Sequence, residues 1–200
     1  FRGHLCSVYG VSFSPDGKWL ASTCLGQTIK IWDFNTQKCT HTLFTNAVGN
    51  ISWSPDSKYI TNGSCYGPIQ IWDVDSGLCI KILQGHEKFV RSASFSPNGK
   101  WIVSGSGDKT IKIWDVKTGE CIHTLHRRPG SVYSVSFSRD GKWLASEDEG
   151  PKRNNIQIWD FDTKKCVCIL EGHVDLVLNV SFSPNGRYIV SGSLDKTIKI

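Results

Sequence analysis

The sequence lacks the features that mark several protein classes. No apolar run approaches the roughly 20 residues that a membrane-spanning helix requires, and the start shows no signal-peptide pattern. Proline is scarce, with seven residues, and hydrophobic residues make up 39% of the chain, which argues against collagen-like and disordered chains. CxxC pairs, HExxH motifs and Walker or GxGxxG loops are absent. These absences favour a globular protein and give no support to a membrane, a zinc site or a nucleotide.

Concentrated charge is also missing. The 23 basic and 18 acidic residues give a net charge of +5, and the lysines recur along the chain instead of gathering in one stretch. A solvated surface is the first interpretation, which disfavours a nucleic-acid patch. A basic face that binds phosphate or nucleic acid stays as the alternative, because basic residues follow or adjoin five similar turns: Lys18, Lys58, Lys100, Lys142 and Arg187. Asp16, Asp56 and Asp140 lie close by and offset much of that charge.

The eight cysteines do not form a disulfide pattern. Four of them recur at spacings of 40, 42 and 45 residues, namely Cys39, Cys79, Cys121 and Cys166. Equivalent positions of successive repeats rarely pair, so we expect reduced thiols and a cytoplasmic or nuclear setting. Cys166 and Cys168 would share one face of a strand, but no further ligands accompany them. We therefore expect no metal and no cofactor.

Two markers reveal an internal repeat. The tripeptide Ile-Trp-Asp recurs at the same spacings, around Trp32, Trp72, Trp114 and Trp159. About twenty residues before each stands a turn signal of the type Phe-Ser-Pro-Asp-Gly, at 13–17, 53–57, 95–99 and 137–141, and a fifth copy occurs at 182–186. Strands rich in Val, Ile, Phe, Trp and Thr flank these turns, and in the third unit we expect them over 90–95, 100–105, 110–116 and 120–125. No segment has helical periodicity, so the chain is predicted to be all-β.

With Gly-His at 3–4, 85–86 and 172–173, the pattern resembles the WD-repeat β-propeller family, the transducin β-like repeats, over the whole chain. The resemblance implies a β-propeller of four-stranded antiparallel blades with five repeat units. We place these units at approximately 3–44, 45–84, 85–126, 127–171 and 172–200. The fifth stops inside a blade and lacks its outer strand, which the first two residues cannot supply. We therefore expect a single propeller domain over 1–200 that forms part of a longer ring.

Two units carry residue types of a nucleophilic triad: His86, Ser104 and Asp108, and again His173, Ser191 and Asp195. The resemblance implies instead a structural hydrogen-bond chain within the blade, which ends on Trp114 in unit three. Recurrence of the set argues against an enzyme, which needs one unique site. The other units depart from the set, with Gly26 in unit one, Asn46, Thr61 and Tyr66 in unit two, and Arg128 in unit four. We predict that units two and four are held less rigidly.

Partners of propellers resembling this one dock on the mouth, the face formed by the loop entering the innermost strand and the loop between the second and third strands. Register places these candidates there: Ser7, Tyr9, Leu25, Phe89, Arg91, Tyr133, Leu176, Leu178 and Leu194. Aromatic rings, leucines and one arginine favour a protein or peptide partner, although Phe89, Leu176 and Leu178 would also suit packing between blades. We expect a charged loop at 147–155 that is three residues longer than its counterpart, and docking or mere decoration would both explain it.

These features together predict a non-enzymatic protein–protein interaction scaffold. It would dock a protein or peptide partner on the mouth as a subunit or domain of a larger regulatory or signalling assembly. Phosphate or nucleic-acid binding through the basic face is the first alternative, and a propeller hydrolase is the second.

Overall fold

The computed structural model describes residues 1–200 except 25–26, 46, 127–129 and 151–152. Its strands form five separate antiparallel sheets, each a blade, and within each blade the strands pair in chain order. Blade one contains β1 (Val8–Phe13), β2 (Trp19–Cys24), β3 (Thr28–Asp33) and β4 (Cys39–Phe44). Blade two contains β5 (Ala47–Trp53), β6 (Tyr59–Ser64), β7 (Ile69–Asp73) and β8 (Cys79–Leu83). Blade three contains β9 (Val90–Phe95), β10 (Trp101–Ser106), β11 (Thr110–Asp115) and β12 (Cys121–His126).

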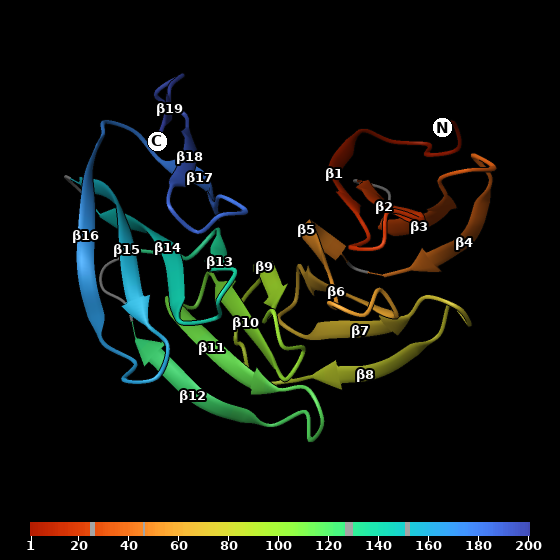
Figure 1. Cartoon of the computed structure of the whole chain (residues 1–200), viewed down its shortest axis with the longest axis horizontal. Coiled ribbons are helices and arrows are strands. Elements are labelled where there is room, and N and C mark those ends of the chain that lie inside the picture. The colour runs from red at the N-terminus through yellow and green to blue at the C-terminus, as the bar shows by residue number, and fades with distance from the viewer. Residues whose placement is uncertain (25–26, 46, 127–129, 151–152) are drawn as a thin grey trace.

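Blade four contains β13 (Val135–Phe137), β14 (Trp143–Gly150), β15 (Arg153–Asp160) and β16 (Cys166–His173). Blade five has three strands, β17 (Val177–Phe182), β18 (Ile189–Ser193) and β19 (Ile198–Lys199). Figure 1 shows the first strand of each blade near the centre and the fourth at the periphery. The prediction of a five-unit β-propeller whose fifth blade lacks an outer strand is confirmed. In the described part of the chain, no helix is long and apolar enough to cross a membrane.

The Pro-Asp-Gly turns are closed by local hydrogen bonds. In blade one, the Gly17 N–H donates to Ser14 O at 2.9 Å, and Gly17 has a positive φ of 73° that suits glycine. The Ser14 hydroxyl donates to Asp16 at 2.6 Å, while the backbone N–H of Trp19 donates to the same hydroxyl at 2.9 Å. The Ser138 turn of blade four repeats these contacts. Serine and aspartate at fixed offsets therefore determine where the first strand ends and the second begins.

The aspartate of each Ile-Trp-Asp closes the next turn. Asp115 accepts the backbone N–H of Thr118 at 2.7 Å, and Asp33 accepts both the N–H and the hydroxyl of Thr36. These hydrogen bonds, led by the one from the Thr36 backbone, lower the pKa of Asp33 below its ordinary value. The repeat aspartate thus joins the third strand to the fourth.

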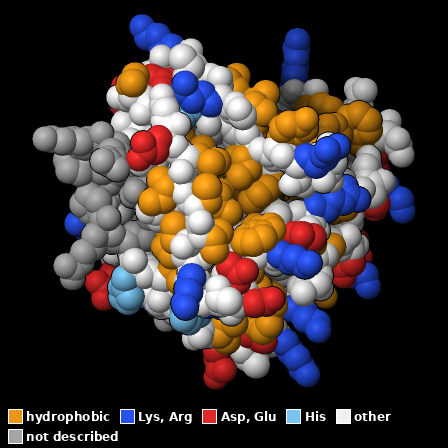
Figure 2. Space-filling view, turned by 60° about the vertical axis from the view of Figure 1, so that its left-hand side comes forward, with side chains coloured by type: hydrophobic (Ala, Val, Ile, Leu, Met, Phe, Trp, Pro, Cys, Tyr) orange, Lys and Arg blue, Asp and Glu red, His pale blue; other side chains and the backbone are white. Residues whose placement is uncertain are grey.

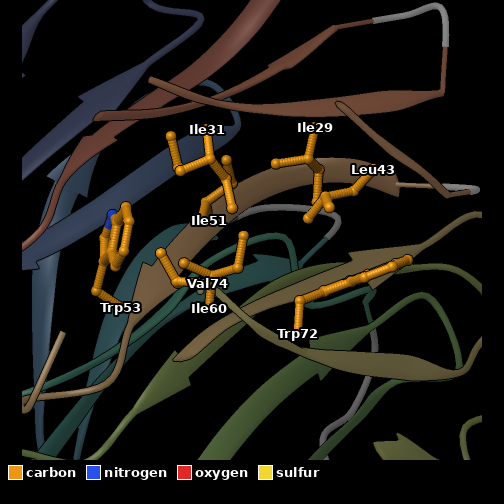
Figure 3. Packing of buried hydrophobic residues seen from close by; sticks show 9 residues of the cluster. Ile29, Ile31, Leu43, Ile51, Trp53, Ile60, Trp72 and Val74 are labelled. Atoms are coloured by element: carbon orange, nitrogen blue, oxygen red, sulfur yellow. The ribbon is translucent and has the colours of Figure 1, made fainter. Parts of the chain in front are cut away.

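The hydrophobic core lies between blades. Figure 3 shows Ile29, Ile31 and Leu43 of blade one packed against Trp72 and other apolar side chains of blade two. The same arrangement recurs at the next two junctions, where Trp114 and Trp159 pack on the preceding blade. A fully buried isoleucine contributes about 1.5–3 kcal/mol, so these interfaces hold neighbouring blades together.

Serine hydroxyls along the inner strands also link the blades. Ser52, Ser92 and Ser134 accept backbone N–H groups of the following blade at 3.1–3.2 Å, from Phe95, Val135 and Val180 respectively. The inner strands line a central channel of about 310 Å³ that is rich in serine. The channel therefore carries neutral polar side chains rather than a charged site.

Blades one and five lie at the two ends of the arrangement in Figure 1, and each exposes apolar side chains on one face. Phe13 is 54% exposed, whereas Phe95, its counterpart in blade three, is 6% exposed. Ile198 of blade five is 73% exposed, whereas its counterpart Ile111 is fully buried. On both faces, apolar side chains are exposed at positions that are buried between blades elsewhere in the propeller.

The surface beside β16 is also apolar, and Figure 2 shows hydrophobic side chains gathered on this side of the molecule. Val167 and Ile169 of β16 are about half exposed. A cavity of about 750 Å³ lies between blades four and five, with Ile156, Leu170 and Ser191 among its lining residues. At the three preceding junctions, the equivalent surface packs against a tryptophan of the third strand.

Candidate functional site

Blade three contains a continuous hydrogen-bond chain from the loop before β9 to β11. Asp108 Oδ2 lies 2.7 Å from His86 Nδ1, and His86 Nε2 lies 2.8 Å from Ser104 Oγ. The indole N–H of Trp114 donates to the same Ser104 oxygen at 2.8 Å. Thr110 extends the chain, because its hydroxyl donates to Asp108 at 2.6 Å, a contact that the sequence reasoning missed. Each buried polar atom of this hydrogen-bond chain has a partner, as expected for a network that stabilises the blade.

Blade five repeats this geometry as far as β19. His173 lies 2.7 Å from Asp195 and 2.9 Å from the Ser191 hydroxyl, and Thr197 donates to Asp195 at 2.6 Å. Both aspartates also accept a backbone N–H from the residue that follows the histidine. These hydrogen bonds therefore connect the loop before the inner strand to the turn between the second and third strands.

These contacts keep the aspartates ionised. Burial raises the pKa of Asp108, but hydrogen bonds from His86 and Thr110 outweigh burial and hold the pKa well below its usual range. The pKa of Asp195 is lowered in the same direction, first by the Thr197 hydroxyl. A histidine held between a carboxylate and a serine resembles a triad, but here the serine oxygen already accepts the tryptophan indole. The Ser104 hydroxyl is therefore hydrogen-bonded within the blade.

Blade one has a shorter chain. His4 Nε2 lies 2.6 Å from Ser22 Oγ, which accepts the Trp32 indole at 2.8 Å. His4 Nδ1 is buried and has no hydrogen-bond partner among the residues that the structure describes. Burial, and then the charge of Lys30, lower the pKa of His4. The expected Gly26 at the aspartate position lies outside the described residues.

Blade two differs from the expectation. Strand register puts Asn62, and not Thr61, at the position of Ser104, since Ile60 pairs with Trp72 as Ile102 pairs with Trp114. The Asn62 side-chain oxygen accepts the Trp72 indole at 2.9 Å, while the Thr61 hydroxyl donates to a backbone carbonyl. The expectation placed Thr61 at this position because threonine, like serine, carries a hydroxyl. The position along the strand, however, depends on the number of residues after the turn, and this number selects Asn62. Asn46, assigned to the histidine position, lies outside the described residues.

Blade four replaces the chain with a buried carboxylate. Trp159 donates its indole N–H to Ser146 at 3.0 Å, and Glu147, which is 1% exposed, accepts the backbone N–H groups of Tyr133 and Ser134. Arg128 lies outside the described residues. That blades two and four are held less rigidly stays a prediction.

The segment 147–155 was expected as a loop, and most of it is strand instead. β14 and β15 extend to Gly150 and Arg153, and cross-strand pairing continues through Glu147–Ile156, Asp148–Asn155 and Glu149–Asn154. The strands were not expected because this segment is charged and lacks the alternation of apolar residues that predicts a strand. A hairpin of this kind forms through backbone pairing, which does not require that alternation. The insertion therefore lengthens blade four.

Three of the nine mouth candidates lie together at the junction of blades three and four. The Phe89 and Tyr133 rings are stacked, with centroids 6.1 Å apart and planes at 25°. The Arg91 guanidinium carbon lies 4.7 Å from the Tyr133 centroid and 5.5 Å from that of Phe89. Arg91 is exposed and both rings are half-buried, so this cluster faces solvent while partly supported by the fold.

The other mouth candidates are spread over blades one and five. Tyr9, Leu178 and Leu194 are 67%, 42% and 52% exposed. Ser7 is exposed and Leu176 half-buried, and the Leu176 carbonyl accepts the Leu194 N–H at 2.9 Å. No ring or cation–π contact joins these residues to the arginine cluster in the described part of the chain. Leu25 lies outside the described residues.

The opposite, turn-bearing face remains the alternative site. Lys18 lies 4.0 Å from Asp16, and the Ser14 hydroxyl lowers the pKa of that aspartate. Asp140 likewise has a lowered pKa, led by the hydrogen bond from Ser138. Charged aspartates therefore accompany the lysines and weaken the case for a phosphate-binding face. Among the described residues, no group of three or more His, Cys, Asp or Glu side chains is placed to hold a metal ion.

The described blades and their tryptophan-to-serine or tryptophan-to-asparagine bonds define a repeat-built β-propeller. A family model described as "WD domain, G-beta repeat" matches residues 1–33, 37–73, 77–115, 119–160 and 164–200. The chain belongs to the WD-repeat family, as the sequence predicted.

Curated relatives match only locally. "Ribosome biogenesis protein BOP1 homolog" of Dictyostelium discoideum is 56% identical over 43 residues, which are 22% of this chain and 5% of that protein. The protein of the same name from Drosophila virilis is 50% identical over 48 residues, 24% of this chain and 6% of its own. That from Monosiga brevicollis is 46% identical over 50 residues, 25% and 6% respectively. The similarity therefore spans about one repeat and a small part of each relative.

Proposed function

We propose that this chain is a non-enzymatic scaffold that docks a protein or peptide partner on the mouth. The observation that carries the proposal is the Phe89, Arg91 and Tyr133 cluster at the junction of blades three and four. Aromatic rings beside an exposed arginine are the composition of an interface hot spot. The His86, Ser104 and Asp108 set supports a non-enzymatic role as well, since the Ser104 oxygen is hydrogen-bonded to His86 and Trp114 within the blade.

The test is an affinity capture from cell extract with quantitative mass spectrometry. We expect a defined set of proteins to bind the wild-type chain and to be lost with the double substitution R91A/Y133A. The control is K58A/K142A on the turn-bearing face, which should retain that set. Thermal unfolding of each variant checks that the propeller is intact. Unaltered capture by R91A/Y133A would reject the mouth as the docking surface.

The partner assembly is proposed from the relatives' names. Because three matched relatives carry the words "ribosome biogenesis", we infer a nuclear assembly for this chain too, supported by similarity over about one repeat. The same capture experiment addresses this point. Proteins lost with R91A/Y133A should include ribosome-assembly factors, and a set without any would remove this part of the proposal.

The exposed end faces also have a proposed role. We infer that the blade-one face with Val11 and Phe13, and the blade-five face with Val190 and Ile198, are covered by further blades of the same repeat. Support comes from register, since the counterparts of Phe13 and Ile198 in blade three are buried by the neighbouring blades. The longer ring is thus a proposal based on exposed apolar surface.

A further inference from the structure

The arginine at the junction of blades three and four lies over two aromatic rings. Arg91 lies within cation–π distance of Phe89, which stands two residues earlier, just before β9, and of Tyr133 in the next blade. A guanidinium stacked on rings keeps the N–H groups of its edge free for hydrogen bonds. Among the described residues, no acidic side chain forms an ion pair with Arg91. The guanidinium is therefore supported by two rings, and its charge has no ion-pair partner in the described part of the protein.

Two features of the surroundings support this geometry. Gly107 lacks a side chain, and a Cβ there would lie 2.5 Å from the Phe89 ring, so glycine makes room for the ring. Glu147 accepts the backbone N–H groups of Tyr133 and Ser134 and so anchors the segment that carries the second ring. The entropy of ordering Arg91 is thus partly lost before a ligand arrives, which favours tight capture.

We propose that Arg91 binds a carboxylate of the docked partner, an Asp or Glu side chain flanked by apolar residues, through a two-point hydrogen-bonded ion pair. This inference rests on the proposed docking function and specifies its chemistry. The carboxylate matches the planar arginine fork, and the adjoining rings of Phe89 and Tyr133 would cover the apolar neighbours. The net charge of +5 favours the approach of an acidic segment.

One cation at this position favours a carboxylate over a phosphate. The register equivalents of Arg91 in the other blades are Tyr9, Gly49, Tyr133 and Leu178, and none is cationic. Proteins that recognise phosphorylated segments use clusters of arginines, because a phosphate group carries nearly two negative charges. A single fork suits a single charge.

The experiment is an NMR titration of the ¹⁵N-labelled chain, in which the Arg91 side-chain N–H signal reports binding. The probes are acetyl-Leu-Glu-Leu-amide, its uncharged counterpart acetyl-Leu-Gln-Leu-amide, and inorganic phosphate. We expect the Glu peptide to shift the Arg91 signal saturably and to bind at least about tenfold more tightly than the Gln peptide, since a charge-assisted hydrogen bond exceeds about 1.4 kcal/mol. R91K should weaken binding about tenfold, because lysine keeps the charge but loses the fork.

For R91Q, binding is followed on the backbone signals of the Phe89 and Tyr133 amides, and it should be lost. K58Q on the turn-bearing face changes net charge equally and should bind as the wild type does. Equal binding of both peptides, saturation by phosphate but by neither peptide, or no saturable shift would each overturn the carboxylate assignment. These failures differ from failure of the docking function, in which capture survives R91A/Y133A.

Discussion

At the scale of single residues, Ser104 joins two hydrogen bonds that would otherwise leave buried groups unpaired. Its oxygen accepts the Trp114 indole N–H and also contacts His86 Nε2, and the residue is fully buried. Buried donors without partners cost more than the hydrogen bond itself contributes, so the serine matters mainly through the groups it satisfies.

The substitution S104A should lower the free energy of unfolding by about 2–4 kcal/mol, because two buried groups lose a partner. S94A on β9 is the control, since Ser94 is half-buried and makes one long contact of 3.4 Å to Phe95 O. It should cost less than about 1 kcal/mol. Urea denaturation measures both, and equal costs would show that the Ser104 network adds nothing specific.

His4 should make blade one sensitive to mild acid. Its pKa is lower in the folded chain than the ordinary value of about 6.5, so the unfolded state binds the proton more readily. Stability is complete above pH 6.5 and falls as the pH drops below it. Hydrogen exchange of β2 and β3 amides at pH 7 and pH 5 measures this, after correction for intrinsic rates. H4N cannot titrate there and should abolish the difference; persistence in H4N would exclude His4 as the cause.

At the scale of elements, close approach between neighbouring blades depends on the absence of side chains at particular backbone positions. Gly49 of β5 has φ +101°, and a Cβ there would overlap the carbonyl oxygen of Arg91 in blade three. Its own carbonyl accepts the Thr23 hydroxyl of blade one at 3.2 Å. Gly49 therefore contacts the Thr23 side chain of blade one and leaves room for the Arg91 backbone of blade three.

G49A should destabilise the chain by about 2 kcal/mol more than G17A does. Both glycines have positive φ, so both substitutions cost about 1–2 kcal/mol of backbone strain. Gly17 has nothing within 4 Å of an added Cβ, whereas Gly49 also meets the Arg91 carbonyl. The extra cost is of the size found for overpacking. Thermal and urea unfolding compare the two, and similar losses would mean that blade three shifts freely.

At the scale of the whole molecule, stability comes from blade-to-blade burial, and it is unequal along the array. Blades two and three are covered on both faces, and blade four is only partly covered on the side of blade five, while blade one and blade five each leave one apolar face open. In repeat proteins each unit is stabilised by its neighbours, so the cost of a substitution should follow the coverage of its face.

F13A should therefore cost less than about 1 kcal/mol in this chain, whereas F95A should cost about 3–5 kcal/mol, the usual cost of deleting a buried phenylalanine. Phe13 and Phe95 occupy equivalent register positions and differ in exposure, 54% against 6%. Denaturation at two protein concentrations measures both. A cost for F13A as large as for F95A, rising with concentration, would show that a second copy covers the face.

The sequence by itself determined the all-β repeat, the turn positions and the five blades, because Trp-Asp and Pro-Asp-Gly signals act locally and recur at a nearly constant spacing. The family match bears this out over most of the chain. The residues of the hydrogen-bond chains were named through the resemblance to WD-repeat proteins, because the repeat matches each position to the family's pattern. The error at Thr61 arose because side-chain type alone does not determine strand register.

Only the tertiary structure decided which distant residues meet. Glu147 lies in the segment expected as a charged loop, yet the fold of blade four buries it against the Tyr133 and Ser134 backbone. The stack of Phe89, Arg91 and Tyr133 depends on the angle between two blades, which no local signal encodes. Strand signals act over a few residues, whereas contacts between blades join residues some forty positions apart, and so the mouth required the assembled propeller.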